Sequence, residues 1–199
     1  MNKIYWSIDL DFWKNTQERS SFSLSFFDDI LRMNVPLCVV GTHHNMLRDI
    51  KRFDFDTIIN TDFHSDLATY EYNHCMPPFN EGTWGNYIAH KRDKTFIWHY
   101  PNYLACCKQG MGYCQGTDFP NPFNGNTKLC GYKRVIKREQ CKPLNKDGTI
   151  IAIGICISPN WSQTNHVIRF EQWMKDNHVR MVPDVQKAFD YTRKIFASH

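Results

Sequence analysis

The chain has 199 residues, of which 42% are hydrophobic and 22% are charged, and its formal net charge at pH 7 is +4. These values are typical of a single globular domain with one hydrophobic core. No apolar run approaches the roughly 20 residues of a membrane span, and residues 1–10 lack signal-peptide features, so we expect a cytoplasmic protein without a membrane partner. The dispersed basic residues do not form a nucleic-acid-binding stripe, so we expect no nucleic-acid partner.

Residues 101–148 differ in composition from the rest of the predicted domain, which spans residues 1–199. They hold five of the eight cysteines, are rich in Gly, Pro and Asn, and show no hydrophobic period. We interpret them as an irregular insertion, either ordered beside the functional site or acting as a lid. Its cysteines form no C-x-x-C pair, so free thiols are expected, with a structural zinc or a disulfide as the alternatives.

The one dense basic cluster also lies in this insertion and consists of Lys133, Arg134, Lys137 and Arg138. We interpret the cluster as a solvent-exposed loop. The alternative is a contact for an acidic leader peptide.

Short apolar segments alternate along the chain with segments of helical spacing. The expected strands are residues 4–10, 36–41, 57–60, 95–98 and 149–157. The expected helices are residues 25–33, 45–53, 85–92, 165–177 and 183–197. Nearly continuous apolar strands that alternate with helices predict a mainly parallel sheet covered on both faces, which is a three-layer α/β/α sandwich.

Three of the expected strands end in side chains that bind metal ions. These side chains are Asp9 and Asp11, then His43 with its neighbour His44, then Asp62, His64 and Asp66. Residues two apart on an extended chain point to the same side, and the carboxyl ends of parallel strands meet at one edge of the sheet. We therefore expect these groups to converge.

Several carboxylates gathered in one place need cations to neutralise them. The expected donors are oxygen and imidazole without thiolate, a set that favours manganese, magnesium or iron over structural zinc. Such a site has room for two ions about 3.5–4 Å apart.

The segment from Asp62 to Asp66 (DFHSD) resembles the D-x-H-x-D motif of the arginase and agmatinase superfamily. The segment from Ser7 to Asp11 (SIDLD) is similar to the S-x-D-x-D motif of the same families, and Gly41-Thr42-His43 to their glycine-led metal histidine. The similarity is closer to the arginase-like family that includes the peptide arginases of ribosomal-peptide maturation. Three segments show this closer similarity. They are the D-L-D-F/W segment, the His-x-x-x-Leu pattern of residues 43–47, and the Glu-containing stretch of residues 81–101 that leads to I-W-x-x-P.

This resemblance implies an arginase/deacetylase-like fold and two Mn²⁺ ions, with Fe²⁺ or Co²⁺ as substitutes. The implied ligands are Asp9, Asp11, His43, Asp62, His64 and Asp66. The implied reaction cleaves the guanidinium of an arginine residue in a precursor peptide to give ornithine and urea. Metal coordination would bring the pKa of water from about 15.7 to roughly 7 and so supply the nucleophile.

Two departures from the family pattern concern the order of the motifs and the length of the chain. In arginases the S-x-D-x-D motif follows D-x-H-x-D, so its N-terminal place here implies a circular permutation. The chain also lacks an equivalent of the extended substrate-binding loops, and an open rim suits an arginine presented on a peptide.

Further residues are candidates for catalysis and substrate binding. A carboxylate matches a guanidinium bidentately, so Glu81 is our candidate for its seat, and a surface position in a loop is the alternative. His44 has three interpretations: a ligand in place of His43, a proton donor beside the site, or the start of a helix. His74, His90 and His99 are weaker candidates for a proton shuttle.

Three rival functions stay open at the level of sequence. Gly41-Thr42-His43-His44 is similar to the tandem histidine of deacetylase-like zinc amidohydrolases, although Asp66 favours a second metal ion. An enzyme that acts on free arginine or agmatine would carry the same motifs. A binding module without activity is the third alternative, and the sequence does not define the oligomeric state.

Overall fold

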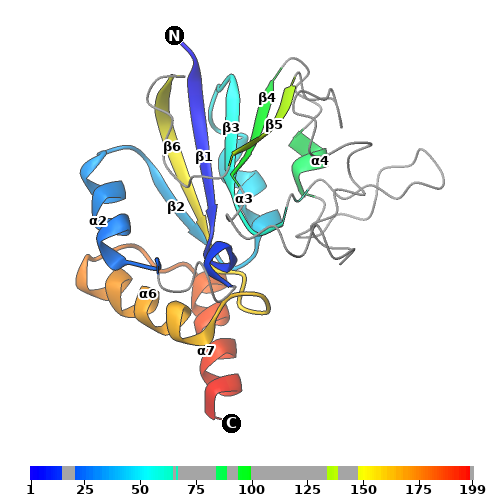
Figure 1. The fold of residues 1–199 in the computed structure, drawn as a ribbon. Helices are drawn as coiled ribbons and strands as arrows, with labels where there is room; N and C mark the ends of the chain where they lie inside the picture. The colour runs from blue at the N-terminus through cyan, green and yellow to red at the C-terminus, as the bar shows by residue number, and fades with distance from the viewer. Residues whose placement is uncertain are drawn as a thin grey trace, which may run out of the picture.

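The computed structural model describes residues 1–14, 21–64, 66, 84–88, 94–99, 134–138 and 148–197. Their strands form one six-stranded sheet in the order β2-β6-β1-β3-β4-β5, and every neighbouring pair is parallel (Figure 1). The strands are β1 (Lys3–Asp9), β2 (Leu37–Val40), β3 (Thr57–Thr61), β4 (Thr95–His99), β5 (Arg134–Arg138) and β6 (Thr149–Cys156).

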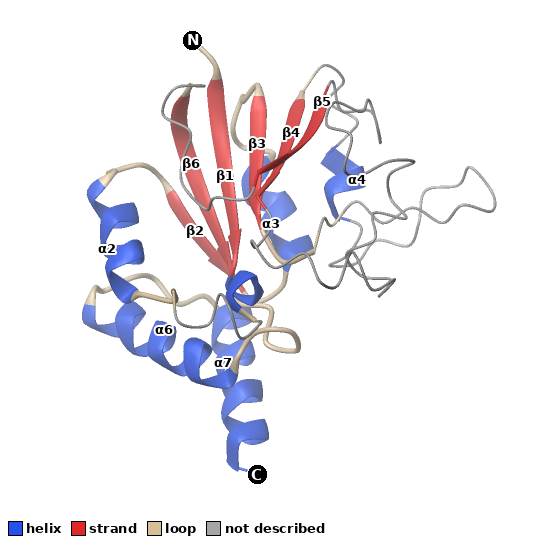
Figure 2. Ribbon diagram, in the orientation of Figure 1, coloured by secondary structure: helices blue, strands red, loops and turns tan. Residues whose placement is uncertain are grey.

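Helices cover both faces of this sheet (Figure 2). The described helices are α2 (Leu24–Arg32), α3 (His43–Ile50), α4 (Trp84–Ile88), α6 (Thr164–Asp176) and α7 (Pro183–Ala197), together with the 3-10 helix η1 (Leu10–Trp13). One hydrophobic core joins α2, α6 and α7 to one face, and a second core joins α3 and α4 to the other. The predicted three-layer α/β/α sandwich with a parallel sheet is therefore confirmed.

The two cores follow from the alternation of side chains along β1. Trp6 and Ile8 pack into the first core with Phe27 of α2, whereas Tyr5 packs into the second core with Met46 of α3. Because both faces of β1 are buried, this strand is apolar almost throughout, as expected for the centre of a parallel sheet. None of the described helices is both long and apolar enough to span a membrane.

Strand β5 corrects one expectation. It pairs with β4 along residues that we had assigned to an irregular insertion, and it includes three residues of the basic cluster interpreted as a loop: Arg134, Lys137 and Arg138. A strand at the edge of a sheet tolerates basic residues, which discourage further strand pairing, so it lacks the continuous apolar run by which we recognised the central strands. Lys133 and the rest of residues 101–148, apart from Gly148, lie outside the described residues.

The connections after β1 and β3 leave the sheet toward opposite faces. The chain passes from β1 through η1 to α2 on one face, and from β3 to α4 on the other. In open parallel sheets, such a reversal creates a crevice at the carboxyl ends of the two strands. The aspartates and histidines singled out in the sequence follow these strand ends.

Close packing under the crevice depends on Gly154 in β6. A Cβ atom at this position would lie 2.5 Å from Sδ of Met46 and 2.6 Å from the hydroxyl of Tyr5. The same sulfur accepts a hydrogen bond from the Ser7 hydroxyl at 3.4 Å, and that hydroxyl also contacts His43. The absence of a side chain at position 154 thus lets α3 approach the sheet where it carries His43.

We expect the substitution Gly154→Ala to lower the free energy of unfolding by about 1–3 kcal/mol, because a buried side chain or the backbone must shift to admit the methyl group. Urea denaturation measures this change. The control is Thr149→Ala at the exposed start of the same strand, which should stay within about 0.5 kcal/mol of the wild type. Equal stability of Gly154→Ala and the wild type would contradict the packing described.

Candidate metal centre

Two aspartates at the ends of β1 and β3 each fix a tight turn. Oδ1 of Asp9 accepts a hydrogen bond from the backbone N–H of Asp11 at 2.9 Å, and Oδ1 of Asp62 accepts one from the N–H of His64 at 2.8 Å. A short Asp side chain commonly accepts the N–H two residues further on and so stabilises a turn. We expected an extended backbone to direct the alternate side chains of each motif to one side, and the structure corrects this expectation, because turns bring the side chains together instead.

The imidazole of His43 lies at the meeting point of three carboxylates. Its Nδ1 atom is 3.1 Å from Oδ2 of Asp9, 3.2 Å from Oδ2 of Asp62 and 2.7 Å from Oδ2 of Asp66. His43 is the first residue of α3, two residues earlier than the helix start expected from the sequence. The helix start therefore carries this imidazole directly into the carboxylate cluster.

Two further contacts fix the ring of His43. Its Nε2 atom lies 3.1 Å from the hydroxyl oxygen of Ser7, and its ring stacks on Trp84 with 4.9 Å between centroids. The indole N–H of Trp84 also donates to Oδ2 of Asp66. A hydrogen bond at the far nitrogen orients a metal-binding histidine, so Ser7 and Trp84 position the ring although the sequence had not assigned them this role.

A second histidine–carboxylate group lies beside the first. Nδ1 of His64 is 2.8 Å from Oδ2 of Asp11 and 4.0 Å from Oδ1 of Asp62. Oδ1 of Asp11 accepts a hydrogen bond from the N–H of Phe63 at 3.2 Å, which links the turn after β1 to the turn after β3. Asp62 thus lies between the two imidazoles.

Among the described residues, three groups have donor atoms within 4.8 Å of one another. The groups are Asp9 with His43 and Cys156, Asp11 with Asp62 and His64, and His43 with Asp62 and Asp66. All six predicted ligands are therefore brought together. Asp62 belongs both to the group that contains His64 and to the group of His43 and Asp66.

Cys156 corrects the expectation of a site without a thiol. It ends β6 directly opposite Asp9 in the sheet register, and its Sγ atom lies 3.1 Å from the hydroxyl oxygen of Ser158. Ser158 in turn donates a hydrogen bond to Oδ2 of Asp9. The sequence carried a signal for both residues, because Cys156 lies in the expected strand of residues 149–157, Ser158 follows that strand, and its carboxyl end had to reach the same edge.

The remaining candidate residues differ in placement. The ring nitrogens of His44 lie 3.3 and 3.4 Å from the hydroxyl oxygen of Thr42, and His44 belongs to none of the three groups found among the described residues. His99 is buried in the sheet, with its Nδ1 atom 3.3 Å from the hydroxyl oxygen of Thr61. Glu81, His74 and His90 lie outside the described residues, so their roles stay predictions.

Burial makes the electrostatics of this cluster unfavourable for free carboxylates, since Asp9, Asp11, Asp62 and Asp66 are at most 6% exposed. Burial, together with the charge of Asp11, raises the pKa of Asp9. Burial and three neighbouring carboxylates raise the pKa of Asp62 well above its usual range. For Asp11, the nearby imidazole of His64 outweighs burial and lowers the pKa.

The two histidines compensate part of this negative charge. Burial acts to lower the pKa of His43, but the carboxylates of Asp66 and Asp9 outweigh it and raise the pKa to about 10. The pKa of His64 is raised against burial mainly by Asp11. The carboxylates therefore favour a positive charge at each imidazole, and in the absence of a metal ion a bound proton supplies that charge.

The donor set fits divalent metal ions. Carboxylate oxygens and imidazole nitrogens are the ligands that Mn²⁺ and Fe²⁺ accept, and an ion would offset the repulsion that raises the pKa values of Asp9 and Asp62. Cys156 adds a neutral thiol, since burial and the charge of Asp9 raise its pKa well above the usual range.

No protein-family model, curated protein or solved structure matches the chain. The interpretation of the centre therefore rests on its geometry and on the motifs in the sequence.

We expect calorimetric titration to show that the protein binds two Mn²⁺ ions. The substitution Asp62→Asn removes the charge common to both histidine groups and should weaken Mn²⁺ binding by about tenfold or more. The matched control is Asp29→Asn, an exposed aspartate paired with Arg32 in α2, which should leave the titration unchanged. Absence of Mn²⁺ binding, or unchanged binding by Asp62→Asn, would contradict the centre.

The stability of the metal-free protein should fall as the pH rises from 6.5 to about 10. The pKa of His43 is raised on folding, so the protonated ring stabilises the fold fully below pH 6.5, and this contribution is lost as the ring deprotonates near pH 10. Urea midpoints measured with a chelator test this trend. With saturating Mn²⁺ the decline should vanish, because the ion replaces the proton. A flat profile for the metal-free protein would show that His43 is not charged there.

Proposed function

We propose that this protein is a binuclear metal hydrolase that cleaves the guanidinium of arginine residues in a peptide and releases urea. Ornithine residues remain in the peptide. The proposed cofactors are two Mn²⁺ ions, with Fe²⁺ or Co²⁺ as substitutes, and the proposed partner is an arginine-containing precursor peptide. This is the peptide-arginase reaction implied by the D-x-H-x-D and S-x-D-x-D motifs.

One observation carries the proposal: two histidine–carboxylate groups share Asp62. His43 faces Asp66 and His64 faces Asp11, with Asp62 common to both groups, and this arrangement supports one ion at each imidazole. The resemblance assigns a bridging or chelating role to Asp9 and Asp66, whereas Asp62 is the carboxylate common to both groups and would help to hold both ions. Two metal ions, when bound, would lower the pKa of water and so supply the hydroxide that attacks the guanidinium carbon.

The open side of the centre lies at His64. Its side chain is 17% exposed, compared with 2% for His43, so a substrate reaches the centre past His64. The rings of Phe63 and Trp161 lie beside it, with centroids 5.1 and 5.4 Å from that of His64. Substrate selection therefore depends on the groups around these two rings.

The aromatic rings at this opening already hold a cation. Nζ of Lys14 lies 4.8 Å from the ring centroid of Trp161 and 5.6 Å from that of Phe63. Aromatic faces attract guanidinium groups in the same way, so the pair suits the approach of an arginine side chain. Glu81 stays our candidate for the carboxylate that receives the guanidinium in the reacting position.

The deacetylase-like alternative requires two adjacent histidines over one zinc ion. Here Nδ1 of His43 faces carboxylates, as a ligand would, while the ring of His44 contacts the hydroxyl of Thr42. Asp66 adds a further carboxylate beside His43, and Asp11 with His64 forms a second group. This arrangement favours two ions and therefore supports the arginase-type reaction over the deacetylase-type reaction.

The test is urea release by the Mn²⁺-loaded protein from an arginine-containing peptide and from free arginine at equal concentration. We expect urea from the peptide, with ornithine found in the product by mass spectrometry. The variant Trp161→Ala should raise KM for the peptide by about threefold or more, because it removes a ring worth about 0.5–1 kcal/mol to a bound cation, while the Mn²⁺ content stays unchanged.

Three outcomes would count against this function. Urea from free arginine but not from the peptide would assign the enzyme to small-molecule metabolism. Deacetylation of an acetyl-lysine peptide by a protein with one zinc ion would favour the rival reaction. No product from any of these substrates, with two Mn²⁺ ions bound, would overturn the guanidinium chemistry and favour a binding module.

A further inference from the structure

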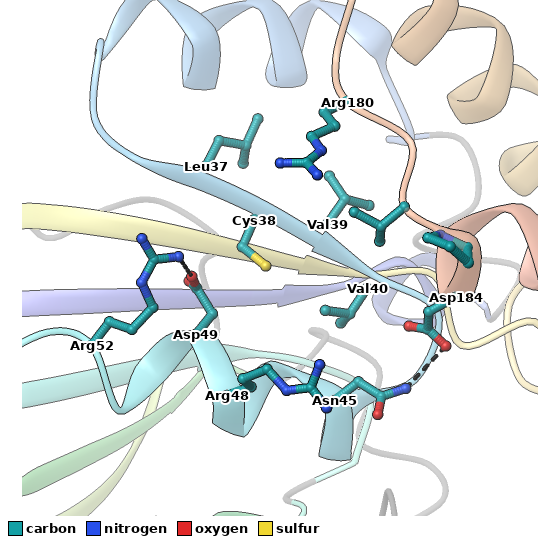
Figure 3. Close-up of a pocket in the computed structure, with 12 residues that line it drawn as sticks. Leu37, Cys38, Val39, Val40, Asn45, Arg48, Asp49, Arg52, Arg180 and Asp184 are labelled. Atoms are coloured by element: carbon teal, nitrogen blue, oxygen red, sulfur yellow. Dashed lines mark hydrogen bonds and ion pairs between the residues drawn. The ribbon is translucent and has the colours of Figure 1, made fainter.

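A groove runs along β2, the strand at the edge of the sheet opposite β5. Its cavity volume is about 650 Å³, and it opens between α3 on one face and the segment that joins α6 to α7 on the other (Figure 3). The lining residues are Leu37, Cys38, Val39, Val40, Asn45, Arg48, Asp49, Arg52, Arg180, Val182, Pro183 and Asp184. The groove thus combines an apolar floor with charged walls.

The floor of the groove is the outer edge of a β-strand. The carbonyl oxygen of Pro36 accepts a hydrogen bond from the N–H of Ile153 in β6, and that of Val40 accepts one from Ile157 directly after β6. Backbone groups alternate in direction along a parallel strand, so those of Leu37 and Val39 point away from β6 into the groove. Within the described part of the chain, no strand pairs with this side of β2.

The walls carry more available positive than negative charge. Both carboxylates are engaged: Asp49 by Arg52 and the Tyr5 hydroxyl, and Asp184 by the backbone N–H of Gly41 and the amide of Asn45. The exposed side chains of Arg48 and Arg180 have no carboxylate partner among the described residues.

These two guanidinium groups lie on opposite sides of the exposed strand edge. Figure 3 shows Arg180 on one side of β2 and Arg48 on the other. A chain laid along the groove would therefore pass between two cations.

We propose that this groove binds an extended, acidic peptide segment, which adds to β2 as a further strand. Leu37 and Val39 supply backbone hydrogen bonds, while Arg48 and Arg180 bind acidic side chains that alternate between the two faces of the added strand. A free strand edge recognises a polypeptide rather than a small anion. The lining has no aromatic residue on which a nucleic-acid base would stack, and this favours a peptide over an oligonucleotide.

This docking site is separate from the metal centre and does not depend on the proposed reaction. The two are nevertheless connected through the chain, because β2 leads through Gly41 and Thr42 to His43. A peptide docked on β2 would be held on the same protein that carries the centre, which raises its effective concentration there.

The experiment measures binding by fluorescence anisotropy of a labelled peptide. The probe is a fluorescein-labelled peptide of about eight residues built from Glu-Glu-Val-Val repeats, which places acidic side chains on both faces of a strand. We expect saturable binding that the double substitution Arg48→Glu, Arg180→Glu weakens by about tenfold or more. The control Lys194→Glu reverses an exposed charge on α7 outside the groove and should leave the affinity unchanged.

N-methylated probes test strand pairing without altering the protein. Methylation of alternate N–H groups blocks one edge of the probe, and because the two edges of the repeat are equivalent, the probe should still bind through the other edge. Methylation of every N–H group blocks both edges and should abolish binding. Equal binding of the half-methylated and fully methylated probes would overturn the proposal. Absence of binding to the unmodified peptide would do the same, as would equal affinities of the arginine variant and the wild type. Binding of a labelled single-stranded oligonucleotide in place of the peptide would assign the groove to another class of partner.

Discussion

The concentration of negative charge at the carboxyl end of the sheet constrains the whole arrangement. Four aspartates at most 6% exposed are gathered around two imidazoles, and burial drives Asp9 and Asp62 toward their neutral forms by raising their pKa values. The chain compensates by protonating His43 and by directing backbone N–H groups at Asp9, Asp11 and Asp62. These partners offset part of the charge, and two divalent cations in place of the imidazole protons would balance all four carboxylates. The proposal of a metal centre follows from this electrostatic requirement, whereas the proposed reaction rests on the resemblance of the motifs.

The order of the strands in the sheet, and not any single element, brings these negatively charged side chains together. β1 and β3 are neighbours in the sheet but send their connections to opposite faces, so their carboxyl ends border one crevice. β6 lies on the other side of β1 and brings Cys156 and Ser158 to the same edge. The start of α3 then adds His43. Segments more than 100 residues apart in the sequence thus meet within hydrogen-bonding distance, as Ser158 and Asp9 do, with a separation of 149 residues.

The sequence predicted the layers of the fold and the aspartates and histidines of the cluster, because both leave local patterns, but it did not predict Cys156. Buried parallel strands are short apolar runs, and the motifs at Asp9 and Asp62 follow them directly. The edge strand β5 escaped prediction because basic residues interrupt its apolar character. The turns at Asp9 and Asp62 also escaped, since a side chain that bonds to the backbone two residues on leaves no period in the sequence. Trp84 gained its role only from its contacts with His43 and Asp66, which a single sequence does not display.

The most direct test of the account is anomalous X-ray scattering from a crystal of the Mn²⁺-loaded protein. The account predicts two anomalous peaks about 3.5–4 Å apart, one beside His43 and one beside His64, with Asp62 in contact with both. A single peak, or peaks remote from these residues while Mn²⁺ is bound in solution, would contradict a binuclear centre at this edge of the sheet.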